Sequence, residues 1–155
     1  MAYKVFMSYS TKDFPLVEHV RNLLQHSSIE VFIAEYSVAP GQSLPAEIIS
    51  AIKNCNLLIL LWSRNSKESE WVPQEIGIAI SEKKPILPAV LEPDISLPGF
   101  ISNLKYLPVY KKPGSALSWL RANVFEQAQK KEQTDGLVWL GLGAAVIALW
   151  WFNQK

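Results

Sequence analysis

The feature that most constrains the fold is an unbroken run of six apolar residues, Leu57–Trp62, near the middle of the 155-residue chain. Such a run is too short to cross a membrane, and it lacks the alternation of a half-buried strand. Continuous apolar strands are typical of parallel sheets that helices cover on both faces. The run therefore predicts an α/β domain with Leu57–Trp62 as its central strand.

Other strands and helices are predicted to alternate around this run. The predicted strands are Tyr3–Ser8, Ile29–Ile33, Leu57–Trp62, Ile86–Leu91 and Leu104–Tyr110. Helices are expected from about Asp13 to Gln25, after Pro45, around Trp71 and Glu75, and from about Ser115 to Gln129, with Leu117, Leu120, Val124 and Ala128 facing inward. This alternation favours right-handed βαβ units, and hence a flavodoxin-like three-layer sandwich with a five-stranded parallel sheet.

Three local features sharpen these predictions. Asp13 is expected to be the N-cap of the first helix, with Pro15 in its first turn. Pro88 falls inside the fourth strand, where it should weaken the hydrogen bonding or mark a bulge. Pro40-Gly41, in the long segment Ala34–Leu44, has the chemistry of a type II turn.

Composition excludes several classes of protein. The net charge of +1 does not indicate nucleic-acid binding, and the single cysteine, Cys55, excludes an internal disulfide framework. His19 and His26 lack the spacing of metal ligands, so no metal site is expected. The first strand runs into Ser8-Tyr9-Ser10-Thr11 rather than a glycine-rich turn, which argues against a dinucleotide-binding Rossmann fold or a P-loop.

The segment after the central strand is the first place to look for a site, because ligands of open α/β sheets bind beyond the carboxyl ends of the strands. Residues 63–69 are expected to form a loop that leads into a helix carrying Trp71 and Glu75. Pro73 is tolerated only near the start of that helix, so Glu75 lies where the helix dipole favours an ionised carboxylate. Alternatively, Glu75 is an ordinary first-turn glutamate of a capping box and Trp71 a rim or core aromatic.

The chain carries an ordered set of motifs: Val5-Phe6-Met7-Ser8-Tyr9, Pro40-Gly41, Ser66, and Trp71-Val72-Pro73-Gln74-Glu75. Over roughly residues 2–129, this set resembles the Toll/interleukin-1 receptor (TIR) domain. The resemblance is closest to the microbial, NAD-cleaving branch, in which a Trp-x-x-x-Glu pair supplies the glutamate required for NAD hydrolysis. Lys4 stands where an acid is common in the first motif, and no Phe-Trp third motif follows, which disfavours a receptor adaptor more than an enzyme.

The resemblance implies NAD+ as the substrate, no cofactor, and Glu75 as the catalytic carboxylate. The nicotinamide leaving group is already cationic, so the general acid of ordinary glycosidases is unnecessary. Glu75 would stabilise the oxocarbenium ion or bind the ribose hydroxyls, Trp71 would stack on a ring, and Lys12 would pair with the pyrophosphate. The expected substrate-binding residues are Ser8, Tyr9, Ser10, Thr11, Lys12 and Trp71.

Three functions stay open at this point. The first is a TIR NAD+ nucleosidase that releases nicotinamide and ADP-ribose or a cyclic variant, activated by self-assembly in microbial defence or signalling. The second is an enzyme similar to nucleoside deoxyribosyltransferases, which share a similar sandwich and place a carboxylate at an anomeric carbon. The third is a non-enzymatic scaffold that signals through TIR–TIR assembly.

The C-terminal region predicts a membrane anchor. Residues 136–152 carry no charge and would extend about 25 Å as a helix, slightly less than the hydrocarbon core of about 30 Å. Tryptophans lie near both ends, and Lys130 and Lys131 precede the segment, which places the domain in the cytoplasm. The expected organisation is a TIR domain over 1–129, a juxtamembrane linker over 130–135 and a transmembrane helix over 136–152; a core helix is the alternative.

Self-association is expected through two segments. Gly141 and Ala145 have the small-xxx-small spacing that lets helices approach closely in a bilayer. The segment Ala34–Leu44 resembles the loop through which TIR domains assemble. The expected partners are therefore NAD+, further copies of the chain and a membrane, but no nucleic acid.

Overall fold

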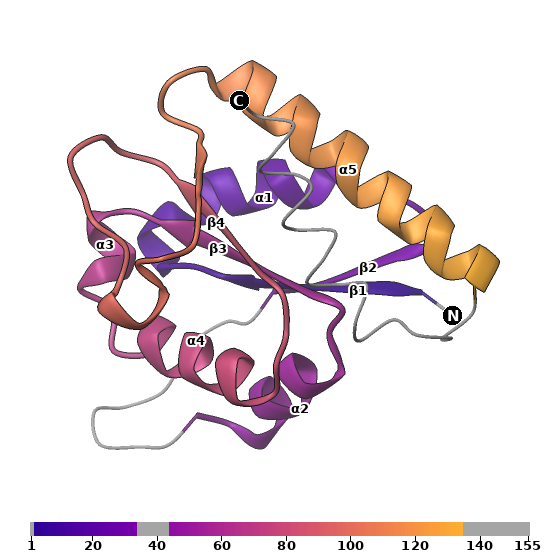
Figure 1. Ribbon diagram of the computed structural model, residues 1–155, viewed down its shortest axis with the longest axis horizontal. Helices are drawn as coiled ribbons and strands as arrows, with labels where there is room; N and C mark the ends of the chain where they lie inside the picture. Colours follow the sequence, from indigo (N-terminus) through magenta and orange to yellow (C-terminus); the bar gives the residue numbers. More distant parts are fainter. Residues whose placement is uncertain (1, 34–43, 135–155) are drawn as a thin grey trace.

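The computed structural model describes residues 2–33 and 44–134, which form one five-stranded parallel sheet with helices on both faces (Figure 1). The strand order is β2-β1-β3-β4-β5, the flavodoxin-like order expected from the alternation of elements. The strands are β1 (Tyr3–Ser8), β2 (Ile29–Ile33), β3 (Leu57–Trp62), β4 (Ile86–Val90) and β5 (Leu107–Pro108). The helices are η1 (Thr11–Asp13), α1 (Phe14–Leu23), α2 (Ala46–Asn54), α3 (Arg64–Lys67), α4 (Val72–Ser81), η2 (Gly99–Ile101) and α5 (Pro113–Thr134).

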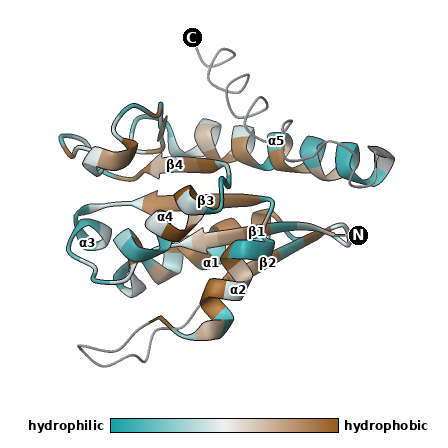
Figure 2. Cartoon of the chain, turned by 60° about the horizontal axis from the view of Figure 1, so that its bottom comes forward, coloured by the Kyte–Doolittle hydropathy of each residue, from teal (hydrophilic) through white to brown (hydrophobic). Residues whose placement is uncertain are grey.

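Two apolar clusters fill the spaces on either side of the sheet. On one face, α1 and α5 cover alternate residues of the strands, such as Met7 and Ile59. On the other, α2 and α4 cover the residues between them, such as Phe6 and Leu58. Every residue of β3 is buried, which confirms the central strand inferred from its apolar run. In Figure 2 the strands are largely brown, as are α2 and α4, whereas α3 and the end of α5 are largely teal.

The fifth strand is much shorter than predicted. The sequence predicts Leu104–Tyr110, but β5 contains only Leu107 and Pro108. The preceding residues turn instead: the Ile101 N–H donates to Pro98 O and the Leu104 N–H donates to Ile101 O. Because Pro108 has no N–H, it cannot extend the hydrogen-bonded ladder.

Pro88 lies in β4 without a bulge, opposite Leu60 of β3. The carbonyl of Pro85 and the N–H of Leu91 bond to β3, whereas the Val90 carbonyl accepts from Tyr110 on the other side. Alternation along the strand therefore turns the Pro88 nitrogen away from β3, toward β5. Pairing with β5 begins only at Ala89, so the missing N–H of Pro88 breaks no ladder bond.

The expected loop after β3 contains a short helix, α3. The Ser63 hydroxyl accepts from the Ser66 N–H, and the Ser66 hydroxyl accepts from the Ser63 N–H at 2.6 Å. This reciprocal capping box stabilises the first turn after the strand. The signal in the sequence was a serine three residues after another serine, and the prediction of a loop over 63–69 was wrong for residues 64–67.

The last helix is longer than expected. Its predicted inward residues, Leu117, Leu120, Val124 and Ala128, are buried, but α5 continues through Thr134, across positions expected to form a linker. No helix within the described ranges is long and apolar enough to cross a membrane. The predicted span 136–152 and its Gly141/Ala145 spacing lie outside the described residues, as does the Pro40-Gly41 turn.

Candidate functional site

The candidate site lies where the strand order reverses, between the carboxyl ends of β1 and β3. The chain leaves β1 toward β2 on one side of the sheet and leaves β3 toward β4 on the other. The two departing segments, 9–13 and 63–71, consequently separate around a crevice. This is the location expected for a ligand in an open parallel sheet.

The buried centre of the site is a contact between Ser8 and Glu75. The Ser8 hydroxyl donates a 2.6 Å hydrogen bond to Glu75 Oε1, and both side chains are 0% exposed. Glu75 is the fourth residue of α4, and its N–H donates to the Trp71 carbonyl. At the start of α4 the Ser69 hydroxyl accepts from the Trp71 and Val72 N–H groups, and the N-cap residue Trp71 makes no side-chain capping bond, so Glu75 is not part of a capping box. Its carboxylate reaches the end of β1 instead.

A pocket of about 340 Å³ brings together the other predicted substrate-binding residues. Its predicted wall residues are Tyr9, Ser10, Thr11, Lys12 and Trp71. The pocket is also lined by three residues that were not predicted from the sequence, Asn65, Glu68 and Glu70. Ser8 and Glu75 do not line the pocket, because they are covered completely. All seven predicted residues thus gather at one edge of the sheet, in two layers.

Asp13 connects the two segments that border this pocket. Its carboxylate accepts hydrogen bonds from Ser63 Oγ at 2.6 Å and from Asn65 Nδ2 at 3.0 Å. Asp13 is the N-cap residue of α1, as predicted, but its side chain makes no capping hydrogen bond to that helix. Asp13 is also the last residue of η1, which is capped by Ser10, whose hydroxyl accepts from the Lys12 N–H. Asp13 serves to hold the segment after β1 against the segment after β3.

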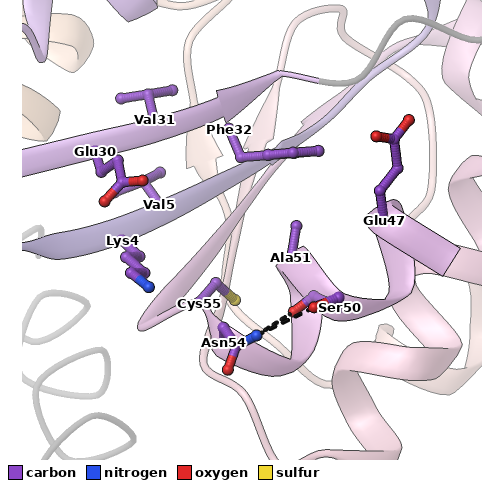
Figure 3. Close-up of a pocket in the computed structure, with 10 residues that line it drawn as sticks. All are labelled: Lys4, Val5, Glu30, Val31, Phe32, Glu47, Ser50, Ala51, Asn54 and Cys55. Atoms are coloured by element: carbon purple, nitrogen blue, oxygen red, sulfur yellow. Dashed lines mark hydrogen bonds between the residues drawn. The ribbon is translucent and has the colours of Figure 1, made fainter.

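A second pocket, of about 300 Å³, opens between β2 and α2 and contains none of the predicted site residues (Figure 3). Lys4, Glu30 and Phe32 line its sheet side, while Glu47 and Cys55 belong to its helix side. Burial raises the pKa of the Cys55 thiol to about 11, so it is protonated at neutral pH. Within residues 2–33 and 44–134, no three His, Cys, Asp or Glu side chains gather as metal ligands would.

Comparison with known proteins identifies the domain. Residues 5–120 match the family described as TIR domain. A probable 2' cyclic ADP-D-ribose synthase, BdTIR, from Brachypodium distachyon is 25% identical over 112 residues, which cover 68% of this chain and 50% of that protein. The chain therefore spans about half the length of this curated relative.

Two solved structures share the fold. The TIR domain of the Toll-related receptor TRR-2 from Hydra magnipapillata superposes with a TM-score of 0.61 at 22% identity, covering 83% of this chain and 99% of that one. The CMP N-glycosidase BcmB from Clostridium botulinum gives a TM-score of 0.52 at 20% identity, covering 74% and 96%. At these identities the likeness concerns the architecture alone.

Proposed function

Since the chain belongs to the TIR domain family, we propose that it cleaves NAD+ at the bond between nicotinamide and ribose, with Glu75 as the essential carboxylate. The observation that carries this proposal is the Ser8–Glu75 hydrogen bond at the β1/β3 crevice, next to a pocket formed by five other expected substrate-binding residues. The relative named as a 2' cyclic ADP-D-ribose synthase supports NAD+ as the substrate class. The products would be nicotinamide and either ADP-ribose or a cyclic isomer.

The chemistry requires little from the protein beyond one well-placed negative charge. Nicotinamide leaves as a neutral molecule from a cationic ring, so no proton has to be delivered to it. Positive charge develops on the ribose, and a carboxylate held in a site without bulk water stabilises it strongly. Glu75 would supply that charge, Trp71 would stack on a ring of the substrate, and the hydroxyls and N–H groups of residues 8–11 would bind its polar groups.

The burial of Ser8 and Glu75 controls the access of substrate to the catalytic carboxylate. Ser8 and Glu75 are both 0% exposed, so a ribose cannot reach the carboxylate until their covering side chains move. We expect contacts between copies of the chain to drive this opening, which would make turnover depend on assembly. In this proposal, residues 34–43 and 136–152 make the contacts between copies of the chain.

The decisive experiment measures nicotinamide release by the full chain, both concentrated in solution and reconstituted in vesicles. Glu75→Gln removes the charge and keeps the shape, and it should lower turnover by at least about 10²-fold, the scale for one preorganised electrostatic group. Glu47→Gln is the matched control, because Glu47 lies in the first turn of α2, is exposed, and does not line the β1/β3 pocket.

Three outcomes would contradict the mechanism. A folded Glu75→Gln variant with wild-type turnover would exclude Glu75 as the catalytic group. Intact NAD+ with every assembled form would favour the non-enzymatic scaffold. Cleavage of deoxynucleosides in preference to NAD+ would favour the enzyme similar to nucleoside deoxyribosyltransferases. Circular dichroism and thermal unfolding of each variant separate lost chemistry from lost folding.

A further inference from the structure

An amphipathic patch lies at the end of the sheet opposite the candidate site. Ile80 and Phe100 are 42% and 54% exposed, and they line a pocket of about 330 Å³ together with Lys83 and Lys84. We call these four residues the basic-apolar patch. No acidic residue lines this pocket. Exposed apolar side chains beside cations are typical of protein surfaces that bind anionic bilayers.

The basic-apolar patch belongs to the amino-terminal edge of the sheet. Lys83 and Lys84 precede Pro85, whose carbonyl accepts from the Leu58 N–H where β3 and β4 begin. Because all five strands are parallel, the starts of β1 and β2 lie at this same edge. Lys4 is exposed there. Glu30 is an exposed acid at this edge, and Glu82 forms a 4.0 Å salt bridge with Lys53.

Helix α5 leaves the domain at this same edge. Arg121 Nε donates to the Leu23 carbonyl at the end of α1, and the Phe125 ring lies 5.2 Å from that of His26, just before β2. The nine residues 126–134 continue the helix for about 13 Å past these contacts, with Gln127, Ala128 and Lys131 still buried against the domain. In Figure 2, the end of α5 and the start of β1 lie on the same side of the domain. The uncharged, mostly apolar segment 136–152 follows after one further residue, Asp135.

We propose that the amino-terminal edge of the sheet rests on an anionic lipid bilayer in which residues 136–152 anchor the chain. Lys83 and Lys84 contact the headgroups, and Ile80 and Phe100 enter the interfacial region. A lipid bilayer is the partner that we propose, because the apolar segment 136–152 follows α5 at the edge that carries the basic-apolar patch. The β1/β3 pocket lies at the carboxyl edge and therefore faces away from the membrane.

The test uses the full chain in vesicles of phosphatidylcholine, alone or mixed with phosphatidylserine. A membrane-impermeant amine-acylating reagent is applied briefly, and mass spectrometry gives the reactivity of Lys4 relative to Lys12. Lys12 is exposed at the opposite edge of the sheet. The reagent does not reach chains that face the vesicle interior, so in those chains neither lysine is acylated. These chains therefore leave the ratio of Lys4 to Lys12 reactivity unchanged. We expect this ratio to fall on the anionic vesicles only.

Two charge-matched variants decide whether the basic-apolar patch is responsible. Lys83→Glu/Lys84→Glu should reduce the protection of Lys4 by at least about fivefold. Each lysine near an anionic surface contributes about 1 kcal/mol to binding, which corresponds to roughly fivefold in affinity. Lys111→Glu/Lys112→Glu makes the same charge change at the carboxyl edge and should leave the protection intact. Phe100→Ser provides a second variant that removes an exposed ring without changing charge, and it should also reduce protection.

Several results would overturn the proposal. Equal ratios on neutral and anionic vesicles would exclude recognition of anionic headgroups. Equal loss of protection in the two double variants would exclude the basic-apolar patch. Protection of Lys4 in detergent without lipid would assign the patch to a protein partner, including a second copy. Loss of NAD+ turnover by Glu75→Gln would not change any of these results, so the two proposals fail independently.

Discussion

The Ser8 hydroxyl and the Glu75 carboxylate meet at 2.6 Å, although 67 positions separate them in the sequence. The contact joins the last residue of β1 to the first turn of α4, and neither side chain has any exposure to solvent. It therefore connects the stability of the fold to the geometry of the candidate site.

Ser8→Ala should lower the free energy of unfolding by about 1 to 3 kcal/mol, because the buried carboxylate loses a hydrogen-bond donor. Urea unfolding of the full chain measures this change. A double-mutant cycle with Glu75→Gln gives the coupling free energy between the two side chains. Coupling indistinguishable from zero would mean that the short contact contributes nothing to stability.

Trp71→Ala should weaken the binding of NAD+ more than it slows turnover. Loss of stacking on a nucleotide ring costs roughly 1 to 3 kcal/mol, which corresponds to a higher Kd or KM with a similar kcat. Trp119→Ala is the control, because Trp119 is also half-buried but lies on α5 and lines a different pocket. Equal effects of the two substitutions on KM would exclude stacking by Trp71.

Asp13→Ala should destabilise the fold by about 2 kcal/mol, since Ser63 and Asn65 both lose their acceptor. It should also raise the KM for NAD+, because the two segments bordering the pocket would no longer be held together. Glu18→Ala serves as the control: it breaks only a surface salt bridge with Arg21 and should change stability by less than about 0.5 kcal/mol. Chemical denaturation of both variants makes the comparison.

The elements that the sequence predicts best are those determined by local apolar pattern. The first three strands have the predicted bounds, since buried runs such as Leu57–Trp62 have few other ways to satisfy their side chains. Segments in which a proline or a pair of serines sets the local structure were predicted less well. Leu104–Tyr110 lost most of its predicted strand to a turn, and residues 64–67 formed a helix because two serines cap each other.

The predicted site residues come together as expected, but their burial could not be inferred from the sequence. Proximity follows from topology, because the carboxyl ends of neighbouring parallel strands meet at one edge. The covering of Glu75 depends on how the side chains around the ends of β1 and α4 pack, which no periodicity encodes. The Asp13 contacts with Ser63 and Asn65 are likewise formed between residues about fifty positions apart.

Lys83→Gly should stabilise the protein by about 1 kcal/mol. Lys83 has a φ of 56° at the end of α4, where its N–H donates to Ile80 O and the next N–H donates to Ala79 O. This Schellman geometry favours glycine, because a Cβ is strained in the left-handed region. Lys83→Ala keeps the Cβ and should bring no such gain. Equal melting temperatures for the glycine and alanine variants would contradict this explanation.

Cys55 should react very slowly with iodoacetamide at neutral pH in the folded protein. Its pKa is raised from 9.0 to about 11, and only the thiolate is nucleophilic, so the rate should increase as the pH approaches 11. Because the unfolded thiol releases its proton at lower pH than the folded one, the Cys55 contribution to stability is complete below about pH 9 and is lost as the pH rises through about 11. Cys55→Ser should remove this part of the alkaline destabilisation, which thermal melts across that range measure.

The strand order also has a consequence for synthesis of the chain on the ribosome. β1 pairs with β2 on one side and β3 on the other, so its second edge stays uncovered until residues 57–62 have been made. During that interval Phe6 and Met7 lie beside a row of unsatisfied backbone groups, which is a template for pairing with other nascent chains. Fragments ending before residue 57 should therefore aggregate. Once α2 and β3 have been synthesised, β3 can pair with the open edge of β1, and the tendency to aggregate should fall.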